Sequence, residues 1–589
     1  MTATALWFGP EQQRLFGWVH HPDGVKAPPA VVLCPVIGIG VTQAHYAYHQ
    51  LAQALEVAGI MVIRFDHHGT GDSAGESTDP DRISVWLRDI ELAAALARSR
   101  GAVSVSLLGL RIAATLAELA AARITDPAAL VLWDPYPSGR SFVRQQRALE
   151  ILRGPEVELN QPDRSAGDSG HSGAQVCSGE SALSSLGGLL DPATLTALEQ
   201  LGPAAYPLGR RPPTLLLHRP ADPGTAQLVK RLGDWSLDRH ELNGQAELID
   251  VAPLYSRVPR ETITVITDWL SLTLKAQAVA VEDPREWWPA PEPLVLDADC
   301  PGPYGAVEER ILKLGDERLF AIESVAADSD PNTPVVVFLN SSSDTHIGPS
   351  RLWVRMARAW ASAGLRCVRL DLSGLGESPV RRGQQEGVVW APEAFDDLPA
   401  ALAAINPTDP GNVILLGLCS GAYQALEMAL TSILRGVVAV NPRFVFTPPE
   451  AQTGSLDPRR RLCVAACSST VRTYRRLTAA TALRPLIPLA RRTRDLCFPR
   501  LPQARGLQRL ADAPVDLLLI CGDVEANQVK SLVRSAEVSG DPATDLEVHV
   551  IPGLDHDLLT PSHQEYVMSL VTDHLLARYA PELPMSTVS

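Results

Sequence analysis

The stretch that decides the fold is Val413-Ile-Leu-Leu-Gly-Leu-Cys-Ser-Gly-Ala422. Its apolar start is typical of a buried strand, and a helical pattern over residues 423–430 follows directly. The small residues between strand and helix leave room for a strained backbone, which is the context of a nucleophile elbow. Cys419 occupies the central position of this turn. We therefore interpret Cys419 as a thiol nucleophile; the alternative is a small buried cysteine that only fills space.

The elbow is one of four motifs that occur twice in the chain at a nearly constant offset. The pattern Asp-x-x-Gly-x-Gly-x-Ser begins at Asp66 and again at Asp371, an offset of 305 residues. The elbow glycines, Gly109 and Gly417, are 308 residues apart. In both halves these motifs are joined by alternating strand and helix patterns. The sequence therefore predicts two α/β domains with parallel sheets that arose by duplication.

The domain boundaries follow from length and composition. A chain of 589 residues is too long for a single hydrophobic core, and residues 281–293 are rich in proline and acidic residues. We predict a first domain over residues 1–280, a linker over 281–305 and a second domain over 306–589.

The composition argues against several classes of protein. Hydrophobic residues make up 46% of the chain, but no apolar run approaches the ~20 residues of a membrane span. The N-terminus lacks the basic and then apolar pattern of a signal peptide. Nine cysteines without paired spacing predict reduced thiols in a cytoplasmic protein, with no zinc, other cofactor or disulfide framework. A net charge of −15 disfavours nucleic acid and anionic membranes as partners.

The motifs of both halves resemble the α/β-hydrolases, in the branch of serine-aminopeptidase-like and exosortase-system-associated hydrolases. In the first half they are Arg64-Phe-Asp-His-His-Gly-Thr-Gly-Asp-Ser-Ala-Gly75, Gly109-Leu-Arg111 and Leu132-Trp-Asp-Pro135. In the second half they are Asn340, Gly348-Pro349-x-Arg351, Asp371-Leu-Ser-Gly374 and Gly417-Leu-Cys-Ser-Gly-Ala422. The resemblance implies two tandem α/β-hydrolase domains, each a mostly parallel sheet flanked by helices with a lid insertion.

The resemblance also implies a catalytic triad in the second half, in the chain order nucleophile, acid, histidine. In this family the acid lies three residues after the glycine that ends its strand, which indicates Glu525, with Asp523 as the alternative. The same spacing after the last strand indicates His556. His563 is a second candidate, but we expect it on the surface of the final helix. Of these residues, His556 and Glu525 are predicted to activate Cys419.

An oxyanion hole is expected beside the thiol. The backbone N–H of Ser420, the residue after the nucleophile, would supply one donor. The loop that begins with Asn340 and Ser341 would supply the other.

The first half departs from the triad pattern at two positions. Arg111 replaces the nucleophile, and Glu247 stands where the histidine is expected. Arginine stays protonated and cannot accept an acyl group, so covalent chemistry is not expected there. Arg111 is predicted either to bind a carboxylate or phosphate of the substrate or to form an internal salt bridge, for example with Glu247.

A basic segment distinguishes the second half. Ten arginines and no acidic residue lie between Arg459 and Arg494, within a predicted lid at about 448–510. These arginines could dock the lid on the acidic first domain, or receive an acidic acyl carrier protein or the phosphates of coenzyme A. The candidate partner-binding residues are Arg472, Arg475 and Arg476.

Three functions are consistent with these observations. We predict an acyl-transfer enzyme of the thioesterase or acyltransferase type, which forms an acyl-cysteine intermediate on a small-molecule acyl substrate. A carboxylic-ester or lactone hydrolase would use the same residues with water as the acceptor. A non-catalytic binding or scaffold protein would require Cys419 to be inert.

Overall fold

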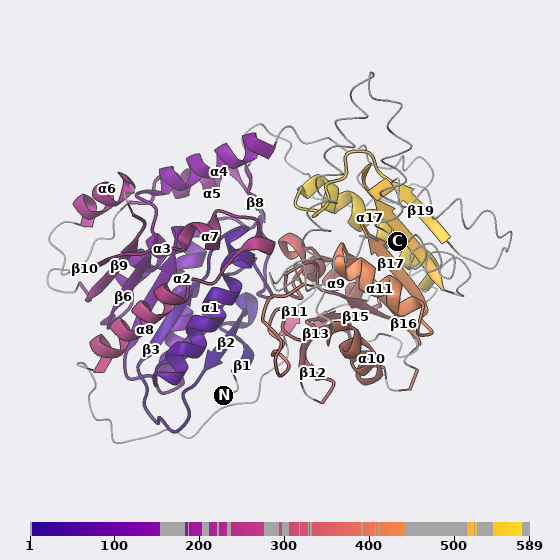
Figure 1. The fold of residues 1–589 in the computed structure, drawn as a ribbon, viewed down its shortest axis with the longest axis horizontal. Coiled ribbons are helices and arrows are strands. Elements are labelled where there is room, and N and C mark those ends of the chain that lie inside the picture. Colours follow the sequence, from indigo (N-terminus) through magenta and orange to yellow (C-terminus); the bar gives the residue numbers. More distant parts are fainter. Residues whose placement is uncertain are drawn as a thin grey trace, which may run out of the picture.

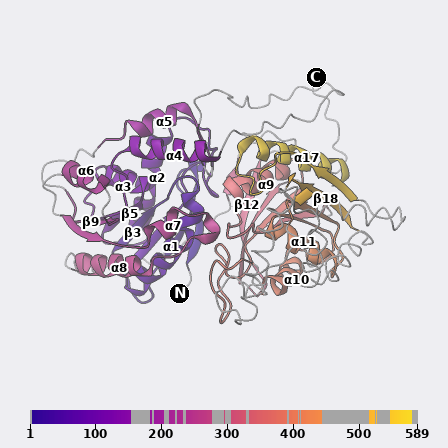
Figure 2. The ribbon, with the colours of Figure 1, turned by 45° about the horizontal axis from the view of Figure 1, so that its top comes forward.

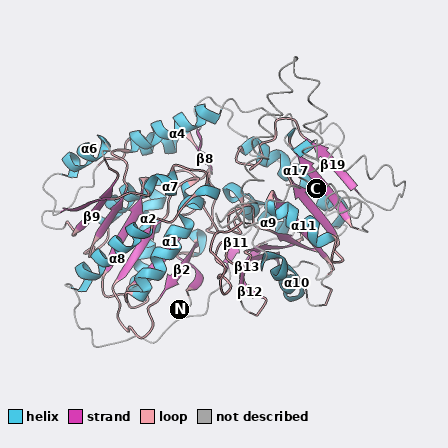
Figure 3. Cartoon of the chain, in the orientation of Figure 1, coloured by secondary structure: helices cyan, strands magenta, loops and turns pink. Residues whose placement is uncertain are grey.

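The computed structural model describes the residues 3–153, 183–185, 188–202, 211–220, 223–232, 237–275, 294–296, 306–316, 318–327, 329, 333–389, 393–406, 408–409, 411–442, 515–523, 525–526 and 546–579. Two large sheets run through this part of the chain, one in each half (Figures 1 and 3). The predicted lid of the second domain and most of the predicted linker fall outside the described residues.

The first sheet has eight strands among the described residues. Their spatial order is β1 (Thr4–Phe8), β2 (Leu15–His20), β4 (Met61–Phe65), β3 (Ala30–Cys34), β5 (Val105–Leu110), β6 (Leu130–Trp133), β9 (Thr214–His218) and β10 (Leu237–Glu241). Strand β2 is antiparallel to both of its neighbours, and every pair from β4 onward is parallel. A separate two-stranded ribbon consists of β7 (Leu183–Ser185) and β8 (Gly188–Leu190).

The second sheet repeats this order. Its strands are β11 (Leu294–Leu296), β12 (Val307–Leu314), β13 (Leu319–Ala326), β15 (Arg366–Leu370), β14 (Val335–Phe338), β16 (Val413–Leu418), β17 (Gly436–Val440), β18 (Asp516–Cys521) and β19 (Leu546–Val550). From β12 to β19 each strand matches one of the first sheet, which confirms the tandem α/β architecture. The additional strand β11 lies within the predicted linker. It pairs antiparallel with β12 and thereby extends the sheet by one strand.

Helices cover both faces of each sheet. The helices of the first domain are α1 (Gly40–Val57), α2 (Arg82–Ser99), α3 (Ile112–Ala121), α4 (Gly139–Arg153), α5 (Pro192–Glu199), α6 (Pro223–Leu232), α7 (Gln245–Ile249) and α8 (Arg260–Lys275). Those of the second are α9 (Leu352–Ser362), α10 (Glu393–Ile405), α11 (Ser420–Ala429) and α17 (Pro561–Tyr579). Short 3-10 turns are η1 (Glu11–Gln13), η2 (Pro253–Tyr255) and η3 (Pro349–Arg351).

The central strands form two cores in each domain because both of their faces are buried. In β3 every residue is buried: Val32 packs on the side of α2 and α3, whereas Val31 packs on the side of α1 and α8. Helix α1 buries a stripe that includes Tyr48 and Leu51, at the spacing expected of an amphipathic helix. In the second domain, α10 and α11 cover one face of the sheet, and α9 and α17 cover the other.

The two domains meet where the antiparallel strands β1 and β2 face β12 and β13 (Figures 1 and 2). The centre of this contact is a buried aromatic cluster in which the ring of Phe320 lies 5.0 Å from that of Trp18 and 6.4 Å from that of Phe16. The cluster removes apolar surface of both domains from water, so it favours their association.

Two reciprocal ion pairs flank the aromatic cluster. Arg64 of the first domain donates two hydrogen bonds to Glu377 of the second, at 2.9 and 2.8 Å. Arg369, 305 residues after Arg64, pairs with Asp72, which lies 305 residues before Glu377. The interface therefore has an internal two-fold relation, which follows from the duplication.

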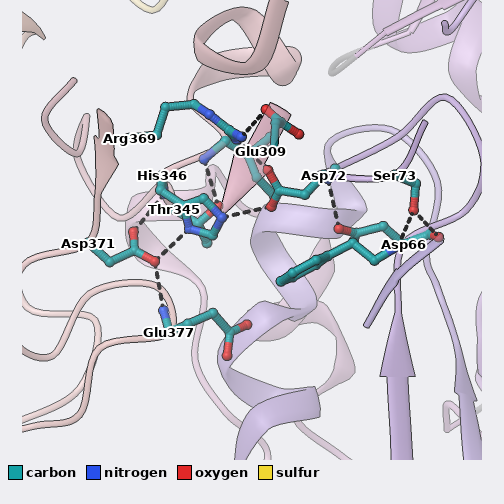
Figure 4. A network of polar contacts seen from close by, with 12 residues as sticks. Asp66, Asp72, Ser73, Glu309, Thr345, His346, Arg369, Asp371 and Glu377 are labelled. Carbon is teal, nitrogen blue, oxygen red and sulfur yellow. Dashed lines mark hydrogen bonds and ion pairs between the residues drawn. The ribbon is translucent and has the colours of Figure 1, made fainter. Parts of the chain in front are cut away.

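The second of these pairs belongs to a larger buried network (Figure 4). Asp72, Arg369 and Glu309 have no exposed side-chain surface, and Arg369 donates to Glu309 at 2.8 Å. His346 bridges the two domains, with Nε2 2.7 Å from Asp72 and Nδ1 2.7 Å from Asp371. Burial would by itself raise the pKa of Asp72, but Arg369 and His346 hold that pKa well below its usual range.

The first prediction concerns this network. Arg369→Met should lower the free energy of unfolding by about 3–5 kcal/mol, because it removes the cation shared by two buried carboxylates. Asp72 would keep only His346, and Glu309 only Arg358. The matched control is Arg310→Met, which removes a partly exposed ion pair with Glu308 and should cost less than about 1 kcal/mol. Urea denaturation of both variants measures the difference. Equal midpoints for the two variants would contradict the assigned network.

The second prediction concerns pH. Burial lowers the pKa of His346, but the carboxylates of Asp371 and Asp72 outweigh burial and raise the pKa to about 10. A pKa that is higher in the folded protein than the ordinary 6.5 contributes stability that is complete below pH 6.5 and is lost as the pH rises through 10. The urea midpoint of the wild type should therefore fall between pH 6.5 and 10 more steeply than that of His346→Gln. Parallel pH profiles would show that His346 does not hold the extra proton.

Candidate active site

The structure places Cys419 in the sharp turn between β16 and α11. Its backbone angles are φ 54° and ψ −104°, a region that costs energy for any residue with a side chain. A Cβ atom on Gly417 would lie 2.1 Å from the backbone of Gly421, so the turn requires glycine there. Arg111 has nearly the same strained angles, φ 58° and ψ −123°. Both domains therefore keep the elbow backbone, although their central side chains differ.

An acid–histidine pair lies at the ends of the last two strands. The carboxylate of Glu525, after β18, is 2.9 Å from Nδ1 of His556, after β19. Nε2 of His556 is buried and has no hydrogen-bond partner among the described residues. Asp523, the alternative acid, instead accepts the backbone N–H of Gly553 at 2.9 Å. The geometry thus associates Glu525 with the histidine and Asp523 with the turn that precedes it.

Asn441 links the acid loop to the histidine loop, a role that the sequence analysis did not assign. This buried residue follows β17, and its side chain accepts the N–H of Gly522 at 2.9 Å. The same amide donates to the backbone carbonyls of Asp555 and His556, both at 3.0 Å. Its only sequence signal was its position at a strand end, where Asp134 stands in the first half.

His563 does not lie on the surface, contrary to the expectation from the sequence. It is 3% exposed at the start of α17, and its Nδ1 is 3.0 Å from the carboxylate of Asp555. Asp555 also accepts the backbone N–H groups of Leu559 and Thr560. His563 and Asp555 therefore shape the loop that carries His556.

The loop after β14 lies against the elbow. The N–H of Ser342 donates to Oγ of Ser420 at 2.7 Å. A Cβ atom on Gly421 would lie 2.7 Å from the carbonyl oxygen of Asn340, so the loop and α11 are in close contact. The side chain of Asn340 is turned to Asp371, to which it donates at 2.7 Å, and Ser341 is buried. The Asn340 amide is therefore engaged with Asp371 and not turned to the elbow.

Arg111 is engaged inside the first domain. Its guanidinium lies 3.8 Å from the centre of the Tyr136 ring, 3.3 Å from the carboxylate of Asp134 and 2.9 Å from Gln145. Glu247, the salt-bridge partner suggested by the sequence, is exposed instead. The partner of Arg111 is instead the carboxylate of Asp134. Strands β5 and β6 are adjacent and parallel, so the residues that follow them, Arg111 and Asp134, lie side by side.

Other predicted features fall outside the described residues or are not found in them. Arg472, Arg475 and Arg476 lie in the segment 443–514, which the structure does not describe. In the described ranges no cluster of three or more histidine, cysteine, aspartate or glutamate side chains could hold a metal ion. None of the described helices is both long enough and apolar enough to cross a membrane.

Family models match both halves of the chain. Residues 336–569 match the alpha/beta hydrolase family, and residues 29–147 match the serine aminopeptidase family S33. No curated protein matches the chain in sequence.

Similar solved structures include Est1E from Butyrivibrio proteoclasticus with ferulic acid bound, an esterase from Pyrococcus furiosus and a dienelactone hydrolase from Anabaena variabilis. Their sequence identities are 14%, 14% and 15%, and their TM-scores are 0.33, 0.31 and 0.29. Each covers about half of the chain (46%, 48% and 47%), which in turn covers 99%, 93% and 99% of them.

The family matches and the repeated strand order agree on one assignment. Each match falls on a different sheet, and the two sheets share one topology. The chain is a tandem α/β-hydrolase protein with one hydrolase-fold domain in each half.

Proposed function

We propose that the second domain cleaves carboxylic esters or thioesters through an acyl-cysteine intermediate on Cys419. The observation that carries this proposal is the combination of the strained elbow at Cys419 with the Glu525–His556 pair. The Nε2 atom of this histidine is buried and has no hydrogen-bond partner in the described part of the chain. Nucleophile and base on strand ends of one parallel sheet lie at the same edge, where ligands of α/β sheets bind. The chain order also matches a nucleophile–acid–histidine triad.

In the proposed reaction His556 removes the thiol proton of Cys419, while Glu525 holds the imidazole in the required tautomer. The thiolate attacks the acyl carbonyl, and the backbone N–H of Ser420 stabilises the oxyanion. Collapse of this intermediate breaks the bond to the leaving alkoxide or thiolate, which takes the proton from His556. A water molecule then gives a proton to His556, and its oxygen attacks the thioester. The carboxylic acid is released and the thiol is restored.

Acyl transfer uses the same first half-reaction. A thioester intermediate stays reactive toward amines and alcohols, so an acceptor other than water would make the protein an acyltransferase. An acidic carrier protein or coenzyme A remains the predicted carrier of the acyl group, through Arg472, Arg475 and Arg476. The alternative of a binding or scaffold protein is disfavoured by the Glu525–His556 pair, because an inert thiol would not need a histidine oriented by a carboxylate.

The first domain is proposed to have no acyl chemistry of its own. Arg111 cannot act as a nucleophile, and its guanidinium already has Asp134 and Gln145 as partners. The charge of Asp134 further reduces the attraction of Arg111 for an anionic substrate. We infer that Arg111 serves mainly to hold the elbow of the first domain together.

The third prediction concerns the nucleophile. Cys419→Ala should abolish both the hydrolysis of p-nitrophenyl esters and the acyl adduct seen in the intact mass of the protein. Ser420→Ala should retain the adduct on Cys419 and lose less than about tenfold in kcat, since only the acceptor of the Ser342 N–H is removed. An adduct on Ser420 in the wild type would show that the nucleophile has been misassigned.

The fourth prediction concerns the first domain. Arg111→Ala should leave kcat/KM within about tenfold of the wild type, or roughly 1.4 kcal/mol, because Arg111 lies in the other domain from the thiol. His556→Ala is the reference, since it removes the proposed base. Should the two variants lose the same activity, the first domain would have to supply chemistry after all.

A further inference from the structure

The loop from Leu339 to His346 connects the candidate active site with the first domain. On the active-site side, its Ser342 N–H donates to Ser420, the residue next to the thiol. Burial, and then the charge of Asp557, raise the pKa of Asp344 to about 7. Asp557 is the residue that follows His556 in the chain.

On its other side the same loop is held by residues of the first domain. Nε2 of His346 is 2.7 Å from the carboxylate of Asp72. The hydroxyl of Tyr46, on α1, donates to the carbonyl oxygen of Ser343 at 3.5 Å. The side chain of Thr42, also on α1, lies near the carboxylate of Asp344 and lowers its pKa. Figure 4 shows His346 between Asp72 and Asp371, the carboxylates of the two domains.

Asp371 binds both ends of the loop. It accepts the backbone N–H of His346 at 2.6 Å and the side-chain amide of Asn340 at 2.7 Å, which fixes the two ends of the loop to one carboxylate. The other carboxylate oxygen of Asp371 is 2.7 Å from Nδ1 of His346. The imidazole of His346 is therefore a rigid link from Asp72 to the backbone beside the elbow.

The link from Asp72 through His346 to Asp371, here called the histidine clamp, is found in only one of the two described halves. The reciprocal ion pairs Arg64–Glu377 and Arg369–Asp72 occur on both sides of the interface. With the same offset of 305 residues, however, the counterpart of His346 in the first half is Val41, which is 37% exposed. The histidine clamp is thus present on the loop beside the candidate thiol and missing from the loop beside Arg111.

We propose that the first domain serves as a positioning domain for the second, in which Asp72 and His346 hold the loop from Leu339 to His346 where its backbone binds the oxyanion. The inference rests on the proposed function, because it assigns a role in that reaction. Asp72 and His346 are positioning residues that touch no reacting atom. A displacement of about 1 Å in an oxyanion donor is enough to lower the rate substantially.

The experiment compares His346→Gln with Glu377→Gln in the full chain. Glu377→Gln weakens the reciprocal ion pair with Arg64, but its carboxylate makes no contact with this loop in the described structure. Two rates are measured: the turnover of p-nitrophenyl esters, and the alkylation of Cys419 by iodoacetamide. Alkylation requires the thiolate but no oxyanion hole, so it reports on the thiol and its histidine alone.

The proposal expects His346→Gln to lower kcat by about 10- to 100-fold, with KM within about threefold and an unchanged alkylation rate. For Glu377→Gln, we expect kcat, KM and the alkylation rate each to stay within about threefold of the wild type. Equal kcat values for the two variants, or an equal loss of alkylation and turnover in His346→Gln, would overturn the proposal.

The following outcomes distinguish failure of the positioning role from failure of the proposed function. If circular dichroism shows that His346→Gln does not fold, Asp72→Asn takes its place with the same expectation, since it nearly preserves the side-chain shape. A wild type that forms no adduct on Cys419 and turns over no ester would overturn the proposed function itself, and the positioning role with it. A wild type that is active and a folded variant that is equally active would overturn only the positioning role.

Discussion

Asp72 lies without exposed surface between Arg369 and His346, both of which belong to the other domain. A carboxylate in this position is tolerated only because two cations replace the water that it lost, so neither domain can leave without exposing uncompensated charge. The aromatic contact of Phe320 with Trp18 adds apolar burial at the same place. The relative placement of the two sheets, and with it the environment of the candidate site, depends on this buried group.

The duplication explains both what the two domains share and where they differ. The strained elbow backbone is kept at Arg111 and at Cys419, since it follows from the strand–turn–helix connection and its glycines. The central residue of the elbow differs between the domains, and so does the residue that ends the adjacent strand: Asp134 after β6 and Asn441 after β17. Asp134 neutralises the arginine in the first domain, whereas Asn441 ties the acid and histidine loops together in the second. One fold thus supports a salt bridge in one half and a candidate triad in the other.

The first domain carries Arg111 and Glu247 where a nucleophile and a histidine are expected, so we assign it a structural role. Its α1 helix and its Asp72 now face the loop beside the thiol of the second domain, with Tyr46 and His346 as the points of contact. A loop held on two sides has few alternative conformations, and a preorganised donor costs no rearrangement when the oxyanion forms. The retained first domain is then a structural part of the proposed active site.

The sequence by itself determined those features that depend on residues close together in the chain. The alternation of strands and helices, the elbow at Cys419 and the repeat were all readable, because local sterics and periodicity decide them. The spacing after Gly522 already favoured Glu525 over Asp523, and the hydrogen bond of Glu525 to His556 depends on the placement of the two strand ends side by side. Tertiary structure alone decided that Arg111 pairs with Asp134. It also decided that His346 meets Asp72, a residue 274 positions away, because no local rule relates residues brought together only by the packing of two domains.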